Sequence, residues 1–172
     1  MNEYYDDEVY HDEDDFWSDI STEEDFPWDE NPDNSEDKTK EKTIHVVYVE
    51  PGEMAVETDI GTELSDLQRA VGGGLIETFY CFDEPVVLVC DDAGKLNGSL
   101  PNRAIYDKNG KVEDIIFGPF FICDCSTEDF GSLTTEQAKQ YKERFLKPED
   151  FYMMDGEVHV TQYTPHSQRG AR

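Results

Sequence analysis

Basic residues are scarce in this chain, and the first 37 residues contain none. The 172 residues include 41 Asp and Glu but only 14 Lys and Arg, which gives a formal net charge of −27. A surface of this charge repels nucleic acid and anionic membranes, so we expect neither as a direct partner. A basic protein surface is attracted instead, over a Debye length of about 10 Å at 0.1 M salt. The charge balance therefore predicts a cationic protein partner.

Long hydrophobic runs are also missing. No apolar stretch reaches the roughly 18 residues that a membrane-spanning helix needs. The acidic beginning of the chain has neither the positive region nor the apolar region of a secretory signal. We therefore expect a cytoplasmic protein without a membrane partner.

Cysteine is limited to four residues, and none of them forms a CxxC pair. Because cytosolic thiols stay reduced, we expect Cys81, Cys90, Cys123 and Cys125 to be free and partly buried. Zinc binding is the alternative, since Cys123 and Cys125 would point to one face of a strand, but Cys81 and Cys90 are too far apart for a zinc knuckle. We predict no metal and no cofactor. The spacing of the residues also does not reveal a nucleophile, a base and an orienting group that could act together, so no catalytic residue is predicted.

What the sequence has in abundance is acid interleaved with aromatic side chains at its N-terminus. Residues 1–37 contain 17 Asp and Glu and seven aromatic residues, and the linker 31–42 contains no apolar residue. Charge and low hydrophobicity oppose collapse, so we predict that residues 1–42 form a disordered acidic arm and linker. The candidate partner-binding residues of this arm are Tyr5, Asp6, Asp7, Glu8, Asp12, Glu13, Asp14, Asp15, Phe16, Trp17, Asp19, Glu23, Glu24, Asp25 and Trp28.

Three interpretations of the arm remain open. It could be a solubility tail, a docking segment whose aromatic side chains fill apolar pockets while its acids pair with Lys and Arg, or a nucleic-acid mimic. An extended arm spaces its charges roughly 7 Å apart, against about 1.7 Å in duplex DNA. A helix would bring them to about 3.3 Å, but Pro27 and Pro32 prevent one continuous helix. Mimicry would therefore need a secondary acidic surface on the domain, for which the candidates are Asp83, Glu84, Asp91, Asp92, Glu128 and Asp129.

Residues 43–163 predict a single α+β domain, followed by a flexible tail at 164–172. The order of elements does not alternate strand with helix, which favours a mainly antiparallel sheet of six or seven short strands with two helices. Apolar and β-branched alternation predicts strands, including an opening hairpin at residues 44–60 and a closing hairpin around Asp155-Gly156. Asn109-Gly110 predicts another tight turn.

Two helices are predicted from capping residues and apolar spacing. Thr62 can cap a short helix that Gly72 ends, with Gly73 and Gly74 following. Thr134 with Gln137 predicts a capping box at the start of a second helix, which Pro148 stops.

The polar segment 95–103, KLNGSLPNR, predicts a loop lying over the sheet. Asn97, Asn102 and Arg103 could offer directional donors to a ligand there, so they are the candidate pocket residues. The alternative is an ordinary turn, because Asn, Gly, Ser and Pro, the residue types around these positions, are common in turns.

Five stretches of the folded part resemble a known family: VVYVEPG at residues 46–52, LQRAVGGGLIE at 67–77, GKLNG at 94–98, NRA at 102–104 and EDFGSLT at 128–134. The chain is similar there to the bacterial and phage family known as domain of unknown function 3846. It departs from the family pattern at residues 99–101, where Leu-Pro-Leu is more usual, and the acidic arm looks like an addition. The resemblance implies a fold unit and an association with mobile elements, and it implies no mechanism.

The leading hypothesis is a non-enzymatic acidic inhibitor from a mobile element or phage. It would bind the cationic nucleic-acid site of a host defence nuclease of the restriction or CRISPR type, where it could act as a nucleic-acid mimic. The alternative is a small-ligand or protein-binding adaptor that uses the loop 95–103, with the arm only a solubility tail.

Overall fold

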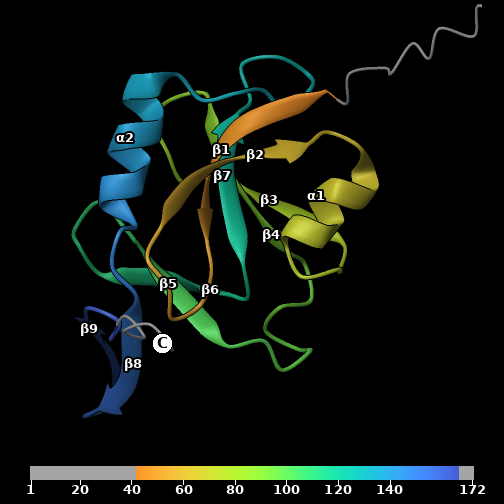
Figure 1. Cartoon of the computed structure of the whole chain (residues 1–172). Coiled ribbons are helices and arrows are strands. Elements are labelled where there is room, and N and C mark those ends of the chain that lie inside the picture. The colour runs from red at the N-terminus through yellow and green to blue at the C-terminus, as the bar shows by residue number, and fades with distance from the viewer. Residues whose placement is uncertain (1–41, 167–172) are drawn as a thin grey trace, which may run out of the picture. The chain divides into compact units, whose positions relative to one another are not determined.

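A five-stranded antiparallel sheet forms the centre of the domain in the computed structural model, which describes residues 42–166 (Figure 1). The predicted arm, up to residue 41, and the tail from residue 167 lie outside the described residues, so their predictions stay untested. In spatial order the strands are β2 (Val56–Gly61), β1 (Thr43–Val49), β7 (Phe120–Asp124), β4 (Val86–Asp91) and β3 (Ile76–Phe79).

The alternation of β1 distributes its side chains between two hydrophobic clusters. Ile44 and Val46 pack into one cluster, and Val47 and Val49 pack into the other on the opposite face. Successive side chains of a strand point to opposite faces, so a strand that is apolar at most positions is suited to the middle of a layered domain. All six residues of β4, which lies on the other side of β7, are buried for the same reason.

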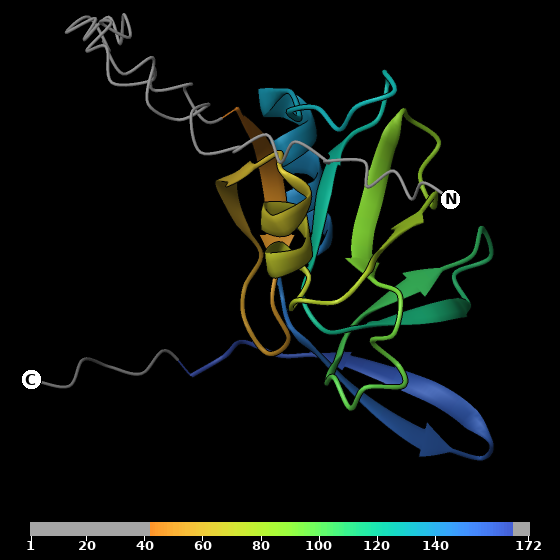
Figure 2. The same cartoon turned by 90° about the vertical axis from the view of Figure 1, so that its right-hand side faces the viewer.

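One helix covers one face of the sheet, and a helix with a β-hairpin covers the other (Figure 2). Helix α1 (Leu64–Ala70) contributes Leu67 to the first cluster, which also contains Val71 from the residue after the helix. Helix α2 (Thr135–Arg144) contributes Ala138 and Tyr141 to the second cluster. The hairpin of β5 (Pro101–Tyr106) and β6 (Val112–Phe117) adds Ile105 and Ile116 to that second cluster.

The two helix starts differ from each other. The predicted capping box of α2 is confirmed, because the Thr134 hydroxyl accepts from the Gln137 N–H and the Gln137 side chain accepts from the Thr134 N–H. The predicted Thr62 cap of α1 is wrong. Glu63 is the N-cap residue and makes no side-chain cap bond, while the Thr62 hydroxyl donates to the Lys42 carbonyl at 3.1 Å. Thr62 therefore fastens the chain at the beginning of β1.

The closing hairpin is confirmed as β8 (Glu149–Met154) paired with β9 (Glu157–Gln162). Its two turn residues, Asp155 and Gly156, have φ angles of 53° and 81°. Such a turn requires positive φ at both central positions, which Asp and Gly tolerate better than most residues. The hairpin extends away from the five-stranded sheet (Figure 1).

The α+β class with a mainly antiparallel sheet and two helices is confirmed. The described residues contain nine strands, more than the six or seven predicted. The prediction of a loop at residues 95–103 is wrong from Pro101 onward, because residues 101–103 begin β5. Pro101 suits this position, since the first residue of a strand need not donate to the ladder.

Neither of the two helices in residues 42–166 is long and apolar enough to cross a membrane.

Candidate functional site

One end of the central sheet brings together several of the predicted acidic residues. Strand β1 begins here with Thr43, and the Lys42 carbonyl accepts from the Thr62 N–H at 3.0 Å, just before helix α1. The β3–β4 turn reaches the same end, where the Cys125 N–H donates to the Pro85 carbonyl at 2.8 Å. We call this region the acidic end; its charged residues are Lys42, Glu63, Asp83, Glu84, Asp124, Glu128 and Asp129.

Most of the acids at this end are free to meet a partner. Asp83, Glu84, Glu128 and Asp129 are exposed. Glu84 does accept a long hydrogen bond, 3.4 Å, from the Tyr141 hydroxyl. The acidic end holds six acids and one base by this count, and two further bases, Lys108 and Arg144, line a hollow with Asp83 and Glu84. Four of the six predicted acids of the secondary surface therefore lie at one end of the sheet.

A shallow hollow of about 290 Å³ lies on the α1 side of the acidic end. Glu128 and Asp129 line it together with Lys42, Leu67 and Phe130. Lys42 is also the residue through which the preceding part of the chain joins the domain. The acids that line this hollow are therefore close to the first described residue of the chain.

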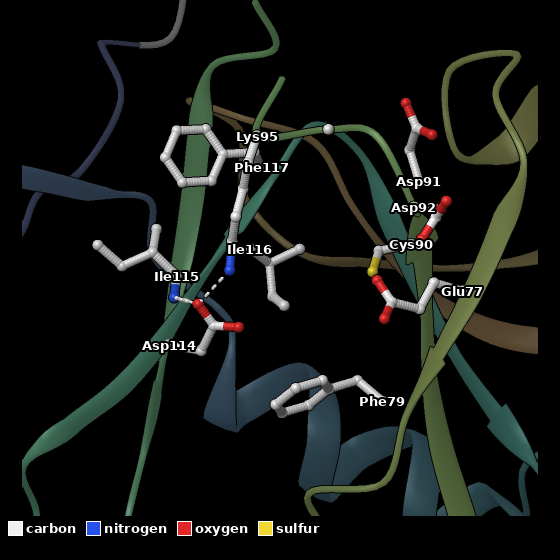
Figure 3. Close-up of a pocket in the computed structure, with 11 residues that line it drawn as sticks. Glu77, Phe79, Cys90, Asp91, Asp92, Lys95, Asp114, Ile115, Ile116 and Phe117 are labelled. Atoms are coloured by element: carbon white, nitrogen blue, oxygen red, sulfur yellow. Dashed lines mark hydrogen bonds and ion pairs between the residues drawn. The ribbon is translucent and has the colours of Figure 1, made fainter. Parts of the chain in front are cut away.

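The other two predicted acids, Asp91 and Asp92, lie at the opposite end of β4. With Glu77 and Asp114 they border a cavity of about 120 Å³ between β3, β4 and β6 (Figure 3). On the β6 side of this cavity the Lys95 ammonium donates to Asp114 at 2.5 Å (Figure 3). The secondary acidic surface therefore divides between the two ends of the sheet.

This cavity is too small for an organic ligand. Ligand pockets usually measure about 300–1,000 Å³, whereas a water molecule occupies about 30 Å³ in the liquid. The Asp91 side chain is also engaged, because Oδ1 accepts from the Ala93 N–H at 3.1 Å and Oδ2 accepts from the Asn97 amide at 2.6 Å. Asp91 and Asn97 thus hold the turn after β4 in shape.

The predicted pocket residues Asn102 and Arg103 lie in the core, with no exposed surface. The Asn102 amide donates to the carbonyls of Val49 at 3.0 Å and Gly118 at 2.8 Å. Its Oδ1 accepts from Arg103 Nη1 at 2.8 Å. Asn102 therefore connects three separate segments of the domain.

The Arg103 guanidinium binds backbone carbonyls in three further places. Nε donates to Phe145 at 3.1 Å, Nη1 to Asn102 at 3.1 Å and Nη2 to Glu53 at 2.7 Å. Burial lowers the pKa of Arg103 to about 10, and the nearby Glu149 carboxylate partly opposes this change. Asn97, Asn102 and Arg103 all have partners inside the domain, so none is available as a ligand donor without rearrangement.

The four cysteines are free thiols whose burial raises their pKa values. The pKa of Cys81 is raised to about 11, and those of Cys90 and Cys123 to about 12, with desolvation the largest cause in each case. Such thiols are poor nucleophiles, since the thiolate is the reactive form. In residues 42–166, no group of three or more His, Cys, Asp or Glu side chains is placed to hold a metal ion.

The predicted arm residues, from Tyr5 to Trp28, lie outside the described residues. Sequence reasoning left Glu63 out of the secondary surface and included Asp91. For Glu63 the missed signal was its place at the start of a predicted helix, where a side chain is usually exposed. For Asp91 it was the strand pattern, because Asp91 directly follows an apolar run that predicts a buried strand.

Residues 44–146 match the protein-family model described as "Domain of unknown function (DUF3846)". The match includes both helices and strands β1 to β7, and it ends before the β8–β9 hairpin. Neither the curated proteins nor the solved structures contain a match to this chain.

Proposed function

The chain belongs to the DUF3846 family. We propose that this domain, together with the acidic arm, inhibits a host defence nuclease. The inhibitor is not an enzyme, and it comes from a phage or another mobile element. It acts in the cytoplasm by occupying the cationic channel in which a restriction or CRISPR-type nuclease holds nucleic acid. Charge-assisted competition with the nucleic acid is the mechanism.

The single observation that supports this proposal most is the place where the acids of the domain gather. Residues 1–37 contribute 17 acids and no base, and the chain enters the domain at the acidic end through a linker that carries Lys38, Lys40 and Lys42. An arm alone spaces its charges too widely to imitate a phosphate backbone. In the proposed complex, acids of the arm and acids of the acidic end both face the cationic channel.

The aromatic residues of the arm would add binding affinity that charge alone does not provide. Surface ion pairs contribute little affinity, whereas buried aromatic side chains are common binding hot spots. In the proposed complex the Trp and Tyr side chains of the arm fill apolar pockets, and the acids around them pair with Lys and Arg of the nuclease.

The adaptor alternative receives less support. It depended on polar donors of the segment 95–103, and Asn97, Asn102 and Arg103 all bind groups within the domain. Lys95 is paired with Asp114 as well.

The test compares three variants with the full chain against a panel of restriction and CRISPR-type nucleases. The first variant lacks residues 1–37, and the second neutralises the acidic end through Asp83→Asn, Glu84→Gln, Glu128→Gln and Asp129→Asn. The matched control removes four exposed acids elsewhere, through Glu53→Gln, Glu77→Gln, Glu113→Gln and Glu143→Gln. Cleavage of labelled DNA and direct binding are measured at low and moderate salt.

We expect the full chain to inhibit one nuclease in competition with DNA, and to bind it at least about tenfold more weakly at moderate salt. Removal of the arm should abolish inhibition. Neutralising the acidic end should weaken binding more than the control variant does. Inhibition that survives removal of the arm, or equal losses in the two four-residue variants, would contradict the proposed mechanism.

A further inference from the structure

The β8–β9 hairpin exposes more large apolar side chains than its size explains. Tyr152 and Met154 are each 49% exposed, Met153 is 66% exposed and Val158 is 37% exposed. Single exposed apolar residues are normal on a protein surface, but a contiguous group of them marks an interaction site. Four such residues lie among the twelve strand residues here, with Met153 and Val158 on one face and Tyr152 and Met154 on the other.

The apolar side chains occupy both faces of the hairpin. Met153 lies opposite Val158, and Phe151 lies opposite Val160, so these four share one face. On the other face the Tyr152 ring stacks on His159, with 5.4 Å between the ring centroids. Both faces of the hairpin therefore offer apolar side chains for contact with a partner.

The base of the hairpin is anchored in the domain, and its far end is not. Glu149 is buried and accepts from the Ala104 N–H at 2.7 Å, and the Tyr163 N–H donates to the Pro148 carbonyl at 3.0 Å. Beyond this base the ribbon extends away from the five-stranded sheet, and the β5–β6 hairpin lies beside it (Figure 2). A two-stranded hairpin is marginally stable in water alone, so a covering partner would stabilise it.

A hollow beside the hairpin can receive apolar groups of such a partner. It measures about 530 Å³ and is lined by Val158 and Val160 of β9 together with Tyr106 and Val112 of the β5–β6 hairpin. One base, Lys111, also lines it. This space is in the range of pockets that hold small ligands or side chains.

The charge around the hairpin selects the kind of partner. Asp150, Asp155 and Glu157 are exposed between and beside the apolar residues, and residues 149–162 contain no Lys or Arg. A second copy of this chain would bring another formal charge of −27, which opposes self-association. A protein whose apolar face is bordered by Lys and Arg complements both features of the ribbon.

We propose that the β8–β9 hairpin is a docking surface for such a protein, with Tyr152, Met153, Met154 and Val158 as its apolar anchors. The hairpin lies outside the residues that match the family model, 44–146. The proposal is independent of the nuclease-inhibitor function and does not require the arm.

Methyl NMR of the full chain, labelled at its methionines, tests the proposal directly. The chain has four methionines, of which Met153 and Met154 report on the hairpin, Met54 on the body of the domain and Met1 on the arm. The probe is a synthetic amphipathic helix of Leu and Lys. The comparison probe has every Leu replaced by Ser and carries the same charge.

We expect the Leu/Lys peptide to shift the Met153 and Met154 signals saturably and to leave Met54 unchanged, whereas the Ser/Lys peptide leaves both hairpin signals in place. Val158→Ser with Tyr152→Ser should weaken the saturable binding read at Met153 at least tenfold. The control Val56→Ser with Leu64→Ser, which removes exposed apolar groups elsewhere, should preserve it.

Three results would overturn the proposal. The hairpin signals could stay unchanged with the Leu/Lys peptide, or the two peptides could shift them equally, which would mean that charge alone acts. Shifts that appear when the concentration of the chain is raised without peptide would make a second copy the occupant instead.

Discussion

Replacing Arg103 by Met should strongly destabilise the domain. The guanidinium has no exposed surface and makes four hydrogen bonds, to the carbonyls of Glu53, Asn102 and Phe145 and to the Asn102 side chain. Met fills part of the volume but leaves these acceptors without their donor. Each buried acceptor that loses its partner costs about 1–3 kcal/mol.

The net magnitude is smaller than the sum of these bonds. Burying the guanidinium itself costs several kcal/mol, and the lowering of the Arg103 pKa to about 10 reflects that desolvation. Removing one member of a buried charged network typically lowers the free energy of unfolding by about 3–5 kcal/mol. A domain of this kind has about 5–15 kcal/mol in total, so the variant should remain folded only marginally.

Urea unfolding followed by circular dichroism measures this loss. With a slope of about 2 kcal/mol per molar urea, the midpoint should fall by about 2 M. The matched control is Arg69→Met, whose side chain is 77% exposed and paired with Asp66, and which should change stability by no more than about 1 kcal/mol. Arg103→Lys should fall between the two, because one ammonium cannot reach three separated carbonyls. If Arg103→Met and Arg69→Met lowered the midpoint equally, the reasoning would be refuted.

Three further predictions concern single groups. The pKa of His45 should lie above 6.5, chiefly because its ring bonds the Asp59 carboxylate, and Asp59→Asn should bring it back in an NMR titration. Its stabilising contribution should be complete below pH 6.5 and disappear as pH rises through the folded-state pKa; an unchanged titration in Asp59→Asn would contradict this. Thr134→Ala should lower the free energy of unfolding by about 1 kcal/mol in urea, since it removes the α2 cap, whereas Thr134→Ser should have little effect; equal losses would contradict the cap. Cys90 and Cys123 should react with a disulfide reagent at pH 8 far more slowly in the folded protein than in urea; immediate reaction of all four thiols would show that they are not buried.

The sequence was most informative where the determinant of structure is local. The alternation in residues 44–49 predicted β1, the spacing of Thr134 and Gln137 predicted the α2 cap, and Asp155-Gly156 predicted the last hairpin. Each of these features depends on a few neighbouring residues. Local propensity is therefore enough to identify them.

Tertiary contacts decided the features that sequence reasoning missed. Asn102 and Arg103 follow Gly98 and Pro101 and look like parts of a turn, yet their hydrogen-bond acceptors include Val49 and Phe145, which are 53 and 42 positions away. Nothing near residue 102 in the sequence reveals those partners. Polarity there reflected a buried network, not a solvated loop.

The candidate site was predicted only in part for the same reason. Charge counts identify acidic residues, but their arrangement depends on which strand ends share an end of the sheet. Glu84 and Glu128 lie at the same end of the sheet because β4 pairs with β7 in antiparallel fashion. Asp91 lies at the other end because the length of β4 separates it from Glu84. Strand order of this kind cannot be read from composition.

The order of the strands also determines when a growing polypeptide can fold. Strand β1 lies between β2 and β7, and β7 begins 71 positions after the end of β1. During synthesis β1 and β2 can form a ribbon early, but β1 must wait for Phe120–Asp124 to leave the ribosome before its second edge is paired. Until then that apolar edge is open to chaperones and to other nascent chains.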